Sequence, residues 1–152
     1  MWLRTSPPRA GRKIAPDAPG SPRLSFQDTI LAPVLRDAVA RLNPDLLPAA
    51  VEEAVRRVTD PVFATDLIAE NRRLHGLLVG GVPVTVLVGG EERHEIARLV
   101  DSEDEANVWA VYNQVDVVGH APRIPDVVVF LNGMPLVVVE LRRRCRRAAS
   151  RI

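Results

Sequence analysis

The sequence is poor in cysteine, aromatic residues and lysine, and each shortage narrows what the protein can be. Cys145 is the only cysteine, so an internal disulfide and a thiolate metal site are excluded, and a reducing cytosol fits. Aromatic residues make up 4% of the chain, too few for a surface that stacks on nucleic-acid bases. Lys13 is the only lysine. With abundant Ala, Val and Pro, this bias points to a GC-rich gene and says nothing about function.

Long hydrophobic runs are also missing. No stretch reaches the roughly 18 apolar residues that suggest a membrane span, and residues 1–20 contain no apolar core of a secretory signal. No GxxxxGK[ST] loop occurs, so a P-loop for ATP is absent from this sequence. We therefore expect a cytoplasmic protein without a membrane partner.

The length and composition fit one domain with a hydrophobic core. The chain has 152 residues, of which 47% are hydrophobic, and a formal net charge of only +1. That charge does not by itself indicate a nucleic-acid binder. The rest of the chain is net acidic, because six positive charges lie in the last eleven residues. They are Arg142, Arg143, Arg144, Arg146, Arg147 and Arg151.

Three helices are predicted after a lead-in rich in Pro and Arg. Apolar residues spaced three to four apart predict a helix that starts near Asp28 and ends at Leu42, with Pro33 near its first turn. A second helix is predicted over residues 48–58. A third is predicted to follow Thr65 as N-cap and to end at Gly80-Gly81.

The apolar pattern then changes to a period of two, which predicts strands. They are expected over residues 82–88, 93–100, 108–118, 127–131 and 136–139. The last two are almost uninterrupted apolar runs, which favours central strands covered on both faces. The fold class expected is α+β, with three N-terminal helices followed by a mostly antiparallel sheet of about five strands.

Two carboxylates flank the last predicted hairpin. Asp126 opens its first strand and Glu140 closes its second. A three-residue loop, residues 132–134, places Asp126 opposite Glu140, with Cβ atoms about 4.5–5.5 Å apart. A two-residue loop on Asn132-Gly133 pairs Asp126 with Val139 instead and turns Glu140 to the other face. The sequence leaves both loops open, although Pro135 disfavours a tight two-residue ladder because it lacks an N–H.

Adjacent carboxylates repel each other unless a cation lies between them. Mg²⁺ prefers oxygen ligands of this kind, and the backbone carbonyl of Leu141 offers a third ligand. Arg142 lies two residues beyond Glu140, so it points to the same face. These residues are the candidate site.

Asp126, Glu140 and a basic residue at position 142 have the spacing of the PD-(D/E)xK nuclease motif. A longer ordered series accompanies it: Ala69-Glu70-Asn71, Leu74-His75, Gly81-Val82, Asn113-Gln114, Pro125 to Phe130, Asn132 to Leu136, and Glu140-Leu141. The series, from roughly Ile14 to Arg142, resembles the N-terminal nuclease domain of the R (restriction) subunit of type I restriction-modification enzymes.

The resemblance implies a restriction-endonuclease-like fold and Mg²⁺-dependent hydrolysis of DNA phosphodiesters. Asp126 and Glu140 would hold the metal, and Arg142 occupies the position of a lysine that activates water. Asn71, His75, Asn113 and Gln114 are further residues of the family series. The implied partners are duplex DNA and the methylase and specificity subunits; ATP would act only in motor domains, whose motifs this sequence lacks.

The sequence departs from the family pattern in three ways. Arg142 replaces the lysine and cannot accept a proton, because arginine stays protonated. The opening helix that usually supplies another acidic group is absent, and residues 143–152 form a non-family tail. We therefore expect a truncated or frameshifted fragment, inactive alone, with a lead-in over residues 1–24 and a partial nuclease domain over residues 25–142.

Several of these residues have a structural interpretation as well. Asp126 and Glu140 could form ion pairs with Arg123 and Arg142, and His75 is more simply a half-buried histidine bonded to the backbone. Asn113 and Gln114 either border the site or satisfy strand edges. The alternative function is a non-catalytic remnant that binds DNA or a partner.

Overall fold

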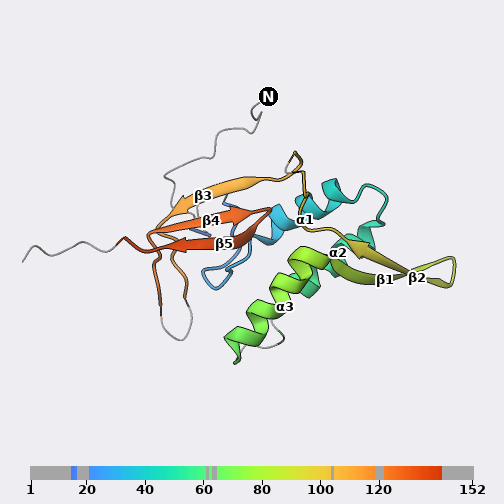
Figure 1. The fold of residues 1–152 in the computed structure, drawn as a ribbon, viewed down its shortest axis with the longest axis horizontal. Helices are drawn as coiled ribbons and strands as arrows, with labels where there is room; N and C mark the ends of the chain where they lie inside the picture. Colours follow the sequence, from blue (N-terminus) through green and yellow to red (C-terminus); the bar gives the residue numbers. More distant parts are fainter. Residues whose placement is uncertain are drawn as a thin grey trace, which may run out of the picture.

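The computed structural model describes residues 15–16, 21–60, 62, 65–103, 105–118 and 122–141. In this part of the chain, three helices precede five strands, which confirms the predicted α+β class (Figure 1). The elements are α1 (Ala32–Leu42), α2 (Pro48–Thr59), α3 (Leu67–Gly80), β1 (Val82–Val88), β2 (Glu91–Ala97), β3 (Trp109–Asn113), β4 (Val127–Leu131) and β5 (Met134–Val139). None of the described helices is long and apolar enough to cross a bilayer.

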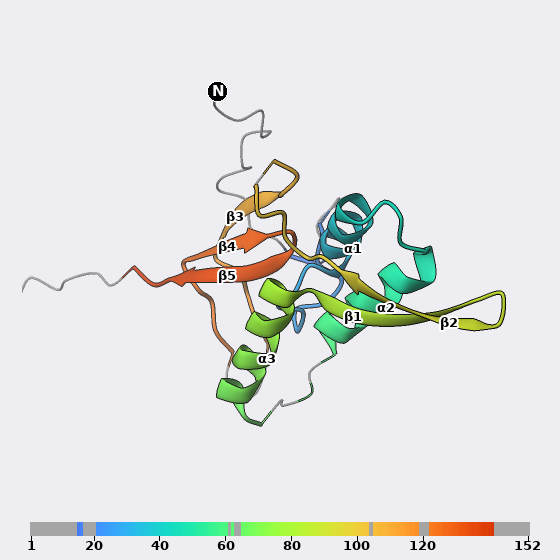
Figure 2. The same cartoon turned by 45° about the vertical axis from the view of Figure 1, so that its right-hand side comes forward.

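The strands form two antiparallel sheets, where the sequence predicted one. β1 pairs only with β2, and the other three strands follow the order β3-β4-β5. The β1–β2 hairpin projects away from the three-stranded sheet (Figures 1 and 2), and α2 packs against β1. The three-stranded sheet is therefore the element that carries both predicted carboxylates.

The main core lies between the first two helices and the β1–β2 hairpin. Burial alternates along β1: Val82, Val84 and Val86 are buried while the residues between them are exposed. They pack with buried residues of α1 and α2 that recur at helical spacing: Leu35, Val39, Ala50, Val51, Ala54, Val55 and Val58. The alternating residues of β1 and the helically spaced residues of α1 and α2 therefore form one core, as their predicted periods indicate.

A smaller core lies beneath the three-stranded sheet. Val128 and Phe130 on β4 pack against Leu31 at the start of α1 and against Val115. The Tyr112 and Phe130 rings meet edge to face, with centroids 5.7 Å apart. The ring contact joins β3 to β4, and Leu31 joins the sheet to the segment that enters α1.

The helix starts differ from the sequence prediction at two places. α1 begins at Ala32 rather than near Asp28, because the Asp28 side chain accepts hydrogen bonds from the Leu24 and Ser25 N–H groups and holds a turn there. The predicted N-cap of α3, Thr65, is wrong. The cap is Asp66, whose Oδ1 accepts hydrogen bonds of 3.0 Å from the N–H groups of Ile68 and Ala69.

The β4–β5 connection is the two-residue turn Asn132-Gly133. Both residues have positive φ, 50° and 85°, the conformation that Asn-Gly favours in tight hairpins. The turn is docked on α1, since the Leu31 N–H donates to the Gly133 carbonyl at 2.8 Å. A three-residue loop is therefore wrong.

β4 is central, as predicted, but the prediction that β5 is central is wrong. β5 forms one edge of the three-stranded sheet. Val137 and Val138 are 48% and 58% exposed, so both faces of this apolar strand are only partly covered by the described residues. An apolar run alone did not distinguish a central strand from an exposed edge.

Candidate active site

The register of the β4–β5 hairpin brings the two predicted carboxylates to the same end. Next to the turn, Leu131 pairs with Met134 and Phe130 with Pro135. A bulge at Leu136 then shifts the pairing by one residue, so Val128 faces Val138 and Val127 faces Val139. Asp126 directly precedes Val127 and Glu140 directly follows Val139, so the two carboxylates lie at the same end of the hairpin. With the two-residue turn, the bulge gives Val127 and Val128 the register that the sequence ascribed to a three-residue loop.

Asp126 is held in place by the backbone that follows β5. The Leu141 N–H donates to Asp126 Oδ2 at 2.6 Å. Asp126 is half-buried and Glu140 is exposed. Sequence reasoning proposed the Leu141 carbonyl as a metal ligand and missed this role of its N–H, which only the hairpin register could reveal.

The structural interpretation of the two carboxylates required ion pairs with arginine. Among the described residues, neither Asp126 nor Glu140 forms an ion pair, and Arg123 forms none either. Arg123 is exposed, and its backbone bonds Val117 in both directions, at 2.9 and 3.0 Å. Arg142 lies outside the described residues. Within the described chain, both carboxylates therefore lack a cationic partner.

The third strand adds Gln114 to the same end of the sheet. Asn113 pairs with Val127, and the Gln114 N–H donates to the Asp126 carbonyl at 3.0 Å. Gln114 follows β3, Asp126 precedes β4 and Glu140 follows β5, so all three lie at the same end of the sheet. In Figure 1 the end of β3, the start of β4 and the end of β5 lie at the left-hand end of the sheet. We call Gln114, Asp126, Glu140 and Leu141 the open end of the sheet. The Gln114 backbone has φ 51°, which ends β3 well short of the predicted residue 118.

The open end offers oxygen ligands of the type that Mg²⁺ binds. It presents two carboxylates, and the described residues contain no group of three or more His, Cys, Asp or Glu side chains that could hold a metal. Mg²⁺ usually keeps several waters and takes one or two carboxylates together with substrate phosphate oxygens. The residues present therefore fit a magnesium ion that is shared with a phosphate, and they do not form a closed protein cage.

Two other residues of the predicted series lie elsewhere. Asn71 and His75, on α3, line a hollow of about 490 Å³ with Met134, Pro135 and Leu136, at the turn end of the hairpin. His75 is exposed and forms no hydrogen bond with the described residues, so its interpretation as half-buried and bonded to the backbone is wrong. The structure thus places Asn113 and Gln114 at the same end of the sheet as the carboxylates, and Asn71 and His75 at the turn end.

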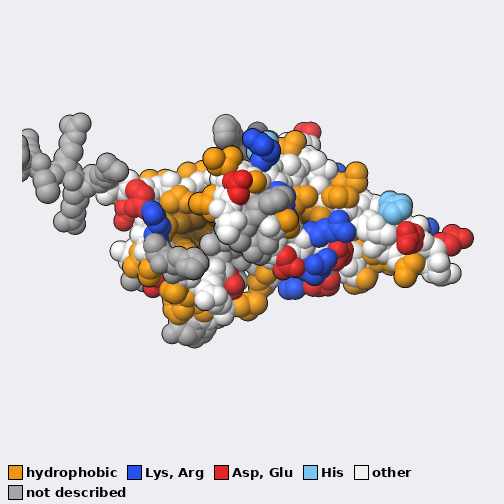
Figure 3. Space-filling model, turned by 90° about the horizontal axis from the view of Figure 1, so that it is seen from below, with side chains coloured by type: hydrophobic (Ala, Val, Ile, Leu, Met, Phe, Trp, Pro, Cys, Tyr) orange, Lys and Arg blue, Asp and Glu red, His pale blue; other side chains and the backbone are white. Residues whose placement is uncertain are grey.

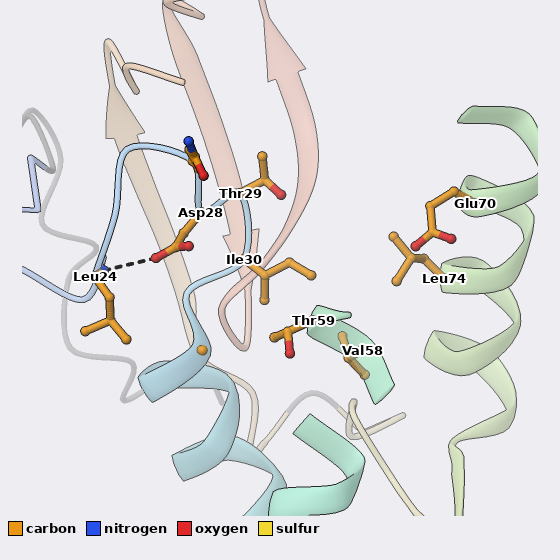
Figure 4. A pocket seen from close by; sticks show the side chains of 10 residues that line it. Leu24, Asp28, Thr29, Ile30, Val58, Thr59, Glu70 and Leu74 are labelled. Atoms are coloured by element: carbon orange, nitrogen blue, oxygen red, sulfur yellow. Dashed lines mark hydrogen bonds between the residues drawn. The ribbon is translucent and has the colours of Figure 1, made fainter. Parts of the chain in front are cut away.

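A neighbouring hollow of about 390 Å³ contains carboxylates that already have partners. It is lined by Asp28, Ile30, Glu70 and Leu74 among others (Figure 4). The Asp28 carboxylate accepts the Leu24 N–H, and Glu70 is ion-paired with Arg73. Figure 3 shows a hollow with a hydrophobic floor on the face seen from below. The two carboxylates of this second hollow are therefore used by the fold, whereas those of the open end have no cationic partner among the described residues.

Comparison with known proteins agrees with the resemblance in the sequence. Residues 7–152 match the family described as type I restriction enzyme R protein N terminus. This range includes part of the lead-in and the whole tail, and the predicted domain boundaries stay a prediction. No solved structure matches the chain.

Two curated relatives are endonuclease subunits by name. The type I restriction enzyme HindI endonuclease subunit of Haemophilus influenzae is 39% identical over 119 residues, which cover 76% of this chain and 11% of the relative. A protein of Methanocaldococcus jannaschii, assigned as the type I restriction enzyme MjaIXP endonuclease subunit, is 27% identical over 137 residues, 87% of this chain and 13% of the relative. The chain spans about an eighth or less of their length. It belongs to the family of type I restriction enzyme R protein N termini.

Proposed function

We propose that this chain is the DNA endonuclease domain of a type I restriction system and that it hydrolyses phosphodiester bonds with Mg²⁺. The observation that carries the proposal is the β4–β5 register, in which Val127 faces Val139, so that Asp126, just before β4, and Glu140, just after β5, lie at the same end of the hairpin. Family membership supplies the reaction class, and the open end supplies two carboxylates without a cationic partner in the described chain.

In this proposal the chain's own residues hold and orient the reactants. Asp126 and Glu140 would hold the magnesium ion, with the Leu141 carbonyl as a third ligand. The Leu141 N–H fixes Asp126 through Oδ2, so the carboxylate is oriented before any ligand arrives. Bound Mg²⁺ would polarise the phosphate and lower the pKa of the attacking water. Water adds to phosphorus, the bond to the leaving sugar oxygen breaks, and that oxygen takes up a proton.

Arg142 limits the rate that we expect. Arginine donates hydrogen bonds to phosphate but stays protonated and cannot take a proton from water. We propose that the isolated chain cleaves DNA weakly or not at all and that Arg142→Lys increases Mg²⁺-dependent nicking of plasmid DNA. No gain in the lysine variant would show that position 142 is not what limits activity.

The remaining functions of a restriction complex are proposed for its other parts. The aligned region makes up 11% and 13% of the two relatives, so ATP hydrolysis would belong to motor domains outside this chain. We propose methylase and specificity subunits and duplex DNA as partners, in the cytoplasm.

A metal titration followed by thermal unfolding tests the proposed site. A metal present at ten times its dissociation constant adds about 1.4 kcal/mol to stability, which is roughly 3–6 °C in Tm for a domain of this size. We expect this rise with Mg²⁺ or Mn²⁺ and its loss in Asp126→Asn, whose side-chain oxygen can still accept the Leu141 N–H.

The matched control is Glu91→Gln, which removes an exposed carboxylate at the far tip of the β1–β2 hairpin. It should leave the metal-induced rise unchanged. A wild-type protein whose Tm responds to neither metal would contradict the site. That result would favour the second function, a partner-binding module, which is supported by the exposed apolar residues of β5.

A further inference from the structure

Among the described residues, two that are not glycine have positive φ, Asn132 at 50° and Gln114 at 51°. Such a backbone is unfavourable for a residue with a side chain, and outliers of this kind concentrate at functional sites. The fold accounts for Asn132, because the tight turn requires the conformation and the side chain is fully buried and hydrogen-bonded.

The fold does not account for the Gln114 side chain. It is exposed, and it forms no hydrogen bond with any described residue. The backbone alone would be served better by glycine. A glutamine is therefore placed at a strained position where neither packing nor hydrogen bonding within the described chain uses its carboxamide.

The position of Gln114 suggests what the carboxamide binds. Its backbone N–H is bonded to the Asp126 carbonyl at 3.0 Å, so the residue is anchored beside the carboxylate pair. DNA phosphate approaching two carboxylates meets repulsion, which a hydrogen-bond donor on the neighbouring strand offsets. A neutral amide donates to phosphate without forming an ion pair with Asp126 or Glu140, so both stay available for a metal.

We propose that Gln114 is a DNA-binding residue of this site and that its Nε2–H donates to a non-bridging oxygen of the phosphate held at Asp126 and Glu140. The inference rests on the proposed function. It assigns to Gln114 a contact with the phosphate and none with the metal. DNA binding therefore tests this inference, and metal binding tests the proposed function.

The test measures binding of a short fluorescent DNA duplex by anisotropy, with Ca²⁺ in place of Mg²⁺ to suppress cleavage. Gln114→Gly keeps the backbone conformation and removes the carboxamide; one lost hydrogen bond to a charged group weakens binding about tenfold. Gln114→Asn keeps a carboxamide in a residue that tolerates positive φ, and it should recover part of the affinity. The metal-induced rise in Tm without DNA should be the same in wild type and Gln114→Gly.

The outcomes distinguish the inference from the proposed function. Equal DNA affinity in wild type and Gln114→Gly overturns the inference, as does a wild-type chain that does not bind the duplex. A metal response that disappears in Gln114→Gly also overturns it, since the residue would then act on the metal. Loss of DNA affinity in a protein without any metal response supports Gln114 as a phosphate contact and contradicts the metal site.

Discussion

The two ends of the β4–β5 hairpin carry polar side chains in opposite environments. At the turn end, Asn132 is buried and its side chain bonds the Leu99 carbonyl, Asn107 Oδ1 and the Val108 N–H, each at 2.8–2.9 Å. At the open end, the Gln114 and Glu140 side chains are exposed and make no hydrogen bond with the described chain. The polar side chain at the turn end therefore stabilises the fold, whereas those at the open end are available to a ligand.

The largest effect is expected from Gly133→Ala at the turn end. A Cβ there would lie 2.7 Å from the Leu31 carbonyl oxygen and 2.8 Å from the Leu35 nitrogen, and backbone atoms cannot move aside cheaply. The overlap and the positive φ together should cost about 3–4 kcal/mol of unfolding free energy, measured by urea denaturation.

Gly89→Ala is the matched control for that overlap. Gly89 also has positive φ, 63°, but nothing lies within 4 Å of an added Cβ. Only the backbone cost of about 1 kcal/mol should remain. Equal losses in the two variants would mean that the turn is not packed against α1 as described.

The second largest effect is expected from Asn132→Gly, which tests the contribution of the Asn132 side chain apart from that of its backbone conformation. Asn132→Gly retains a residue suited to positive φ but removes the bonds to Leu99, Asn107 and Val108. Leaving these buried groups without a partner should cost about 2–3 kcal/mol, again measured by urea denaturation. A loss below 1 kcal/mol would mean that water replaces the amide and that the turn end is less closed than its burial indicates.

A smaller, pH-dependent effect is expected from Asp101, which is linked to the turn end through Asn107. Hydrogen bonds from the Ala106 and Glu103 N–H groups lower the pKa of the Asp101 carboxyl below its ordinary value of 3.8. A carboxyl with a lowered folded-state pKa stabilises the protein above its ordinary pKa, and this contribution is lost as the pH falls through the folded-state value.

Asp101→Asn should therefore destabilise the protein at pH 7 and flatten the fall of Tm as the pH drops below the ordinary pKa of the carboxyl. Glu53→Gln is the comparison, because Arg56 and Arg57 lower the pKa of Glu53 to about 2 on the surface of α2. An acid profile of Asp101→Asn parallel to that of wild type would assign the acid sensitivity to groups other than Asp101.

The sequence predicted the elements better than their connections. Helical spacing and alternation depend on neighbouring residues, so the cores built on Leu35, Val82 and Val128 follow directly from the pattern. The two carboxylates were found by the same means, since each borders an apolar run. Their role as metal ligands stays a prediction.

What the sequence could not supply was set by contacts between distant segments. The bulge at Leu136 depends on how β5 lies against β4, and the division into two sheets depends on how the chain leaves β2. Pro135, which lacks an N–H, was the one local sign of an irregular ladder. The left-handed backbone of Gln114 had no local sign, because glutamine shows no preference for it.

The smallest effect on stability is expected from Gln114→Gly, and it tests most directly the difference between the two ends of the hairpin. Gln114→Gly relieves a positive φ worth about 1 kcal/mol but gives the unfolded chain more freedom, worth about 0.4–1 kcal/mol in the other direction. Urea denaturation should therefore show a change between zero and about 0.6 kcal/mol of added stability. A clear loss would mean that the side chain holds the fold together, as Asn132 does. Unchanged or increased stability would mean that the carboxamide is retained at the open end for something other than folding.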